Sequence, residues 1–175
     1  MKKNLLTISA LALAVMSGSA MAADTEVLFN GAVSNVTCDV NVNVNGVAGN
    51  TVALGTVAVG TAGTAKPFTL MPDLTQPGCQ NLTTANTAQV NFIPTQLGAQ
   101  GLPAAAGSAA SDAYVKIDTI NAKTTAVQSV TSANSTVEFD GQVFHDDGAQ
   151  FNAYLQGGTQ TGLMTAAASF AVTYN

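Results

Sequence analysis

The sequence predicts an all-β domain, built as an antiparallel sandwich or barrel. Apolar and polar residues alternate with a period of two along most of the chain, as in Val40, Val42 and Val44, which alternate with asparagines. No stretch longer than about ten residues keeps the apolar repeat of an amphipathic helix. Turn signals rich in glycine and proline separate many of the alternating runs, and short strands at this spacing are typical of sandwiches and barrels.

The chain begins with the three parts of a secretory signal peptide over residues 1–22. Two lysines follow the first methionine, residues 5–16 are mostly apolar, and a small-residue cleavage site ends at Ala22. The apolar stretch is shorter than the roughly 17–25 residues that a membrane-spanning helix needs. We therefore expect export of a mature protein, residues 23–175, without direct insertion into a membrane.

Alternating runs and clusters of β-branched and aromatic residues predict ten strands. In chain order they cover residues 25–29, 32–36, 40–44, 51–59, 67–71, 88–93, 113–120, 136–144, 149–155 and 163–174. Alanine and glycine dominate residues 98–113, where we expect a surface loop with room for a short helical turn at 104–106. No repeat and no linker divides the mature chain, which is long enough for one domain with a sizeable core.

The mature chain is acidic and sparsely charged. Residues 23–175 hold three lysines, no arginine and ten acidic residues, a net charge of −7. We expect no nucleic-acid partner and no anionic membrane surface, because both require a basic protein surface. Charged residues make up 9% of the sequence, against about a quarter in a typical soluble domain. Such a surface suits burial against copies or partners; an ordinary polar, uncharged coat is the alternative.

Residues suited to catalysis or metal binding are few. Cys38 and Cys79 enclose 40 residues, and an even pair in an exported protein predicts a disulfide that contributes about 4 kcal/mol. One histidine and two distant cysteines lack the clustered spacing of a zinc site. The stretch from His145 to Gly148 is interpreted as a hairpin turn. The sequence also shows no nucleophilic serine in a hydrolase motif that could pair with His145. A secreted hydrolase thus lacks a catalytic constellation, and we expect no enzyme activity, cofactor or metal.

The most distinctive patterns lie at the two ends of the mature chain. Val27 and Phe29 share one face of a short extended segment, with Glu26 on the opposite face. At the other end, alternate positions form an apolar row that runs almost to the last residue: Met164, Ala166, Ala168, Phe170, Val172 and Tyr174. Periodicity alone favours an ordinary closing strand of a complete sandwich.

Taken together, these ends resemble the pilin subunits of chaperone–usher fimbriae. The residues that carry the resemblance are Val27-x-Phe29-Asn30-Gly31-x-Val33, Thr37-Cys38, Cys79, Gly162 as the fourteenth residue from the end, and the penultimate Tyr174. The resemblance covers the mature chain from end to end. It implies an incomplete immunoglobulin-like β-sandwich completed by a donated strand, with residues 23–31 as an N-terminal donor-strand arm and 32–175 as the pilin domain.

The resemblance also implies partners and a role for each end. In this family a periplasmic chaperone lends a strand and holds the C-terminal carboxylate, here at Asn175. An outer-membrane usher then exchanges that strand for the arm of another subunit. Val27 and Phe29 become arm residues, and Gly162 opens the groove-lining strand that continues through the apolar row. Residues 23–30, at about 3.3 Å each, reach about 26 Å, which is adequate for a strand in a groove.

The expected function is that of a structural subunit, built into a fimbria with copies of itself or related pilins. Such a protein passes through the periplasm to the cell surface and supports cell adhesion. The alternative is a minor tip subunit or adhesin that binds a host glycan. Tip adhesins of the family usually add a receptor domain, and the mature chain has no room for one.

Overall fold

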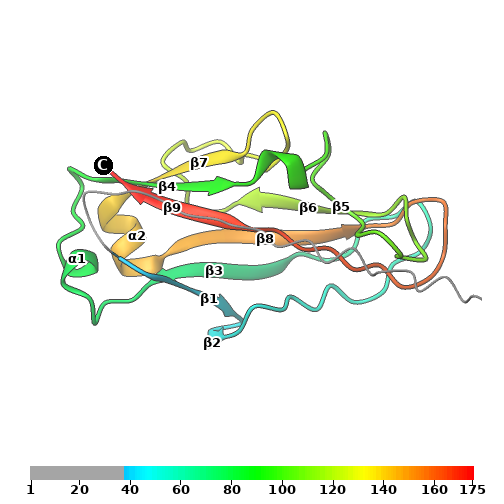
Figure 1. Cartoon of the computed structure of the whole chain (residues 1–175), viewed down its shortest axis with the longest axis horizontal. Coiled ribbons are helices and arrows are strands. Elements are labelled where there is room, and N and C mark those ends of the chain that lie inside the picture. Colours follow the sequence, from blue (N-terminus) through cyan, green and yellow to red (C-terminus); the bar gives the residue numbers. More distant parts are fainter. Residues whose placement is uncertain (1–37) are drawn as a thin grey trace, which may run out of the picture.

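The computed structural model describes residues 38–175, which form two antiparallel β-sheets packed against each other (Figure 1). The strand order is β2-β1-β3-β8-β6-β5 in one sheet and β7-β4-β9 in the other. The strands are β1 (Val40–Val44), β2 (Val47–Ala48), β3 (Lys66–Pro72), β4 (Thr87–Phe92), β5 (Leu102–Pro103), β6 (Tyr114–Thr119), β7 (Thr136–Asp140), β8 (Ala149–Gln156) and β9 (Phe170–Tyr174). Three short helices join them: α1 (Pro77–Gln80), η1 (Pro94–Gln96) and α2 (Gly141–Asp147). The predicted all-β sandwich of antiparallel sheets is confirmed.

The core between the two sheets is centred on Phe151 of β8, which is fully buried. Its ring stacks on Phe68 of β3 at 5.2 Å between ring centroids. It also meets Phe92 of β4 edge-on at 5.7 Å and Phe139 of β7 at 5.6 Å. The aromatic cluster therefore joins strands of both sheets, and it fixes the sandwich at its middle.

The alternating pattern predicts the central strands well. Residues 67–71, 88–93, 113–120 and 149–155 become β3, β4, β6 and β8 with small shifts at their ends. In β4 the residues that face the core are Ala88, Val90 and Phe92, in step with the pattern. The predicted strands at 25–29 and 32–36, like the signal peptide, lie outside the described residues.

The predicted strand 136–144 is wrong in its second half, where the chain forms α2. The Asp140 carboxylate accepts hydrogen bonds from the backbone N–H groups of Gln142 and Val143, at 2.9 and 3.3 Å, and so caps the helix. Gly148 ends the helix with φ 71°, and a Cβ there would meet the Leu70 carbonyl oxygen at 2.7 Å. The interpretation of His145 to Gly148 as a hairpin turn is therefore wrong, because these residues finish a helix.

Three other expectations are corrected by hydrogen-bond partners. Residues 51–59 form no strand, because no neighbouring strand pairs with them in the described part of the chain. The strand expected over 163–174 is restricted to Phe170–Tyr174, since residues 163 and 165 bond to the 105–110 loop instead. The loop 98–113 contains the short strand β5 paired with β6, and no helical turn forms at 104–106.

Candidate functional site

The strand β9 lies at the edge of its sheet in the described part of the chain. On one side it pairs with β4 in the register Ala88↔Tyr174, Val90↔Val172 and Phe92↔Phe170. No described strand lies on its other side. Thr87 and Asn175 exchange both backbone hydrogen bonds, each at 3.0 Å. Bonded pairs alternate in an antiparallel ladder, so the backbone N–H and C=O groups of Phe170 and Val172 point away from β4.

The remaining sheet edges are short or protected. β2 and β5 have two residues each, and Pro103 removes a hydrogen-bond donor from β5. The outer edge of β7 is engaged by the loop before it, because Lys123 N–H donates to the Glu138 carbonyl at 2.8 Å. Among the described strands, β9 therefore offers the most accessible edge for an added strand.

The core is incompletely covered next to this free edge. Several apolar side chains pack against the core cluster yet remain half-exposed, and eight of them lie on β1, on β9 or on the segments 51–57 and 163–169. We call the surface they form the open strip: Val40, Val42, Val52 and Leu54 on one wall, and Met164, Ala166, Phe170 and Val172 on the other. A further strand would bury such side chains, and no strand formed by residues 38–175 lies over them.

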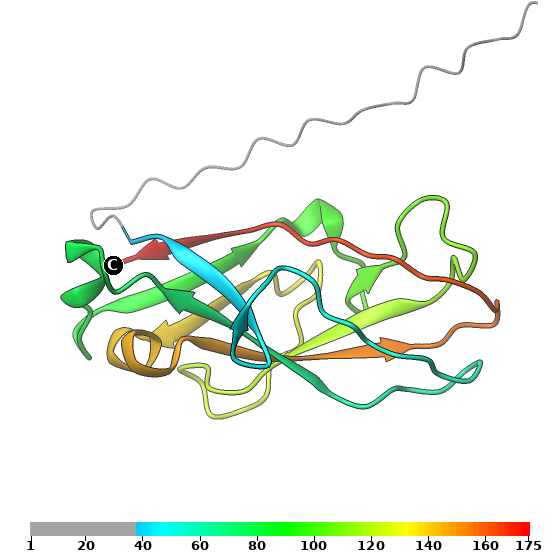
Figure 2. The same cartoon turned by 90° about the horizontal axis from the view of Figure 1, so that it is seen from below.

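The first wall continues in residues 51–57, which have no backbone partner within residues 38–175. Their side chains nevertheless alternate, since Val52, Leu54 and Val57 are half-buried and their immediate neighbours in between are exposed. Figure 2 shows this segment, cyan to teal, and the C-terminal segment, orange to red, both running toward the end of the molecule opposite the C-terminus. Unpaired backbone on this wall can also bond to an added strand.

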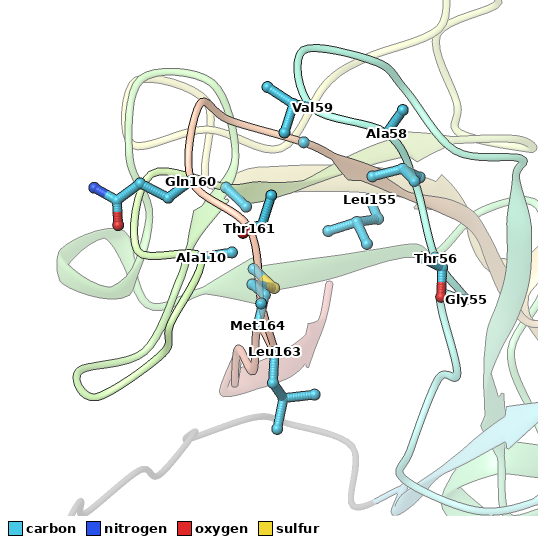
Figure 3. Close-up of a pocket in the computed structure, with 14 residues that line it drawn as sticks. Gly55, Thr56, Ala58, Val59, Ala110, Leu155, Gln160, Thr161, Leu163 and Met164 are labelled. Carbon is cyan, nitrogen blue, oxygen red and sulfur yellow. The ribbon is translucent and has the colours of Figure 1, made fainter.

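An apolar pocket of about 400 Å³ lies at that end of the open strip (Figure 3). Residues 55–59 line one side and 160–164 line the other, with Leu155 between them. None of the lining side chains is ionisable, and the polar ones are Thr56, Gln160 and Thr161. The pocket therefore suits an apolar side chain and holds no group for acid–base or metal chemistry.

Gly162 takes a backbone conformation that requires glycine. Its φ is 129°, in the region that side chains rarely adopt, and a Cβ there would meet the Cβ of Ala109 at 2.5 Å. After it, the Leu163 carbonyl accepts from Ala109 N–H at 2.9 Å, and the Thr165 carbonyl accepts from Ala105 N–H at 2.7 Å. These bonds hold Met164 and Ala166 on the core, while Ala168 of the same sequence row is exposed.

The other end of the open strip is fixed by the predicted disulfide, which is confirmed. Cys38 and Cys79 are bonded, with their Cα atoms 4.8 Å apart. The Tyr174 hydroxyl donates to the Cys38 carbonyl at 3.2 Å. The Tyr174 ring packs on the ring of Phe144 in α2, with 5.8 Å between the ring centroids. Burial, with a smaller contribution from the Asp39 charge, raises the pKa of the Tyr174 hydroxyl, so it stays a neutral donor. The point where residues 1–37 join the described domain therefore lies beside the chain's C-terminus.

The last residue is also held in place. Asn175 pairs with Thr87 through its backbone, and the Asn86 side-chain amide donates to the Asn175 carbonyl at 3.4 Å. The C-terminal carboxylate thus stands at a defined position at the end of β9. Val27 and Phe29, the expected arm residues, lie outside the described residues.

The remaining candidate chemistry is sparse. On α2 the His145 Nδ1 atom lies 2.6 Å from the Asp146 Oδ1 atom. Within residues 38–175 there is no group of three metal-ligating side chains. The same part of the chain has no helix of sufficient length and hydrophobicity to span a lipid bilayer.

Sequence reasoning missed one wall of the open strip. It identified the C-terminal row but predicted an ordinary strand over residues 51–59. The available signal was the alternation of Val52 and Leu54 in a stretch bounded by Gly49 and Gly60. That alternation predicts a buried face correctly, but it does not reveal that the strand partner is missing.

Comparisons with known proteins extend over the whole chain. No protein-family model matches it. Its sequence is 41% identical over 172 residues to the F107 fimbrial protein of Escherichia coli, with 98% of this chain and 99% of that protein covered. It is 30% identical over 189 residues to the K99 fimbrial protein of Escherichia coli, with 99% of each covered. The crystal structure of the P pilus rod subunit PapA aligns with 86% of this chain and 100% of its own, at a TM-score of 0.49 and 14% identity. The two full-length matches show that this chain belongs to the family of fimbrial proteins, the pilin subunits that its two ends resemble.

Proposed function

We propose that this fimbrial subunit assembles by donor-strand exchange, in which the open strip of each copy receives the N-terminal arm of another copy. The observation that carries the proposal is the edge of β9 that no described strand covers, beside half-exposed core side chains. An added strand would bond to the outward backbone groups of Phe170 and Val172 and cover the apolar row. It would complete the sandwich with material from a second molecule.

The arm matches the open strip in length and pattern. Residues 23–31 span about 30 Å when extended, and the row from Met164 to Val172 has the same number of residues. Val27 and Phe29 lie on one face of the arm and can enter the strip together. Each buried apolar side chain contributes about 1.5–3 kcal/mol, and each backbone hydrogen bond adds about 0.5–1.5 kcal/mol. A filled strip is therefore expected to hold copies together durably.

The position of Cys38 favours an arm that runs antiparallel to β9. The arm leaves each copy beside its own C-terminus, since Tyr174 contacts Cys38 there. A parallel donated strand would place the donor domain at the same end of the acceptor, where the acceptor's own arm also leaves. An antiparallel strand places the donor at the pocket end instead. Each copy then joins its neighbours at opposite ends, and the contact repeats as a filament.

The exposed edge also explains the need for assembly partners. A free strand edge above an uncovered core is prone to aggregation until it is covered. A periplasmic chaperone that lends a strand would cover it, and the ordered carboxylate of Asn175 offers a fixed contact point. An outer-membrane usher would exchange that strand for an arm, and the finished fimbria at the cell surface would support adhesion.

Deletion of residues 23–29 tests the role of the arm. The truncated subunit keeps its open strip, so we expect it to co-purify with the chaperone in normal amount. It has no arm to donate. We therefore expect that electron microscopy of cells that express only the truncated subunit shows no fibres. Glu26→Gln, on the opposite face of the arm, is the matched control and should assemble normally. Fibres of normal length from the truncated subunit would contradict the proposed function.

A further inference from the structure

We infer that Leu74 of each donating copy packs against the rim of the pocket on the accepting copy, formed by Val59 and Leu163. The inference rests on the proposed antiparallel strand donation and adds a second contact between the same two copies. It concerns side chains that face solvent and belong to neither wall of the open strip.

The rim is an exposed apolar surface at the pocket end. Leu163 is 77% exposed and Val59 is 49% exposed. They stand on opposite sides of the pocket, on the segments 55–59 and 160–164 (Figure 3). A donated arm that runs antiparallel to β9 would leave the strip between these two segments. The rim therefore surrounds the place where the arm continues into the donating domain.

Leu74 stands at the matching place on the donating copy. It is 41% exposed, and it lies in the turn that precedes α1. That turn is bonded to the start of the described chain, because Asp73 N–H donates to the Asp39 carbonyl at 2.8 Å. Asp39 N–H donates in return to the Gln76 side-chain oxygen at 3.0 Å. Since Asp39 follows Cys38 directly, Leu74 lies next to the point where the arm joins the domain.

The length of the connection keeps these two surfaces close. If residues 23–31 fill the strip, only residues 32–37 link them to Cys38. Six residues reach at most about 20 Å when fully extended. The α1 end of the donor must therefore sit near the pocket end of the acceptor, and Figure 1 shows these as the two opposite ends of one domain.

Apolar contact is the attractive force that we infer at this junction, because the carboxylates at its two ends do not attract each other. Asp73 is half-buried beside Leu74 on one end, and Asp112 accepts hydrogen bonds from Thr159 at the pocket end. Both ends thus present carboxylates, which cannot form an ion pair with each other. Two different patches that meet head to tail form a heterologous contact, which repeats without closing and suits a fibre.

Cysteine cross-linking of assembled fibres tests the junction. The variant with Leu74→Cys and Leu163→Cys is treated with a short bismaleimide, boiled in SDS and separated by size. We expect a ladder of covalent multimers well beyond the dimer. Each single variant, and the control pair Val47→Cys with Leu163→Cys, should give no such ladder; Val47 is 70% exposed but lies on the β1–β2 hairpin.

A second pair keeps the test decisive if the first one disturbs folding. Leu74→Cys with Val59→Cys probes the other side of the rim and should give a ladder as well. Fibres that form normally but show no ladder with either pair would overturn the junction and leave strand donation intact. Failure of strand donation itself would show instead as normal fibres from the subunit that lacks residues 23–29.

Discussion

The Phe170→Asp variant is expected to lose both chaperone capture and fibre assembly. Phe170 lies on β9 with its ring 6.1 Å from that of Phe92, half-exposed in the middle of the open strip. A donated strand would bury a carboxylate there without a partner, which costs several kcal/mol. Because 1.4 kcal/mol corresponds to a factor of ten in affinity, co-purification with the chaperone should fall by at least tenfold.

Ala167→Asp is the matched control for this variant. Ala167 is exposed on the same C-terminal segment, next to Ala166, which packs on the core. The carboxylate should stay in water at this position, so capture and assembly should remain close to wild type. Equal loss in both variants, or undiminished capture of Phe170→Asp, would show that the strip is not the surface that receives a strand.

Removal of the disulfide is expected to lower the free energy of unfolding by about 4 kcal/mol, as the chain-entropy relation gives for a loop with a sequence separation of 41. Total stabilities of domains are about 5–15 kcal/mol, so the double variant Cys38→Ser with Cys79→Ser should stay folded but unfold at a clearly lower guanidinium concentration. Residue 38 also carries the backbone carbonyl that accepts from Tyr174, so loss of its covalent tether should loosen this contact and the end of β9.

Guanidinium unfolding of the purified mature subunit measures this effect. The double variant without reductant and the wild type with reductant should have the same reduced stability, because both lack the same bond. A change below about 1 kcal/mol in both would contradict the assignment of a stabilising role to this bond.

The sequence predicts most of the sandwich because its strands are buried on one face. In β4, Ala88, Val90 and Phe92 alternate with polar residues and face the core. The pattern at Gln142–Phe144 is too short to distinguish helix from strand by period, and capping decides it. In the sequence, Asp140 before the helix and Gly148 after it are the capping signals that indicate a helix here.

The candidate site shows a different limit of sequence reasoning. Alternation reports which side chains face the core, and it did so for Met164, Phe170 and Val172 and for Val52 and Leu54. It does not report whether a neighbouring strand is present, because backbone pairing leaves no trace in side-chain polarity. The missing partner became visible from the strand order and the unbonded 51–57 segment. Resemblance to a family supplied the expectation of a missing strand.

Residue-specific amide hydrogen exchange in β9 tests the missing strand most directly. The mature subunit lacking residues 23–29 is measured with and without a peptide of residues 23–31; a peptide with Val27→Asp and Phe29→Asp is the control. The amides of Ala171 and Thr173 face β4 and should be protected throughout, whereas those of Phe170 and Val172 face the free edge. We predict that only the native peptide slows exchange at Phe170 and Val172, by at least tenfold. If these two amides are already as protected as Ala171 without peptide, and no peptide changes them, the sandwich is complete on its own and the account is wrong.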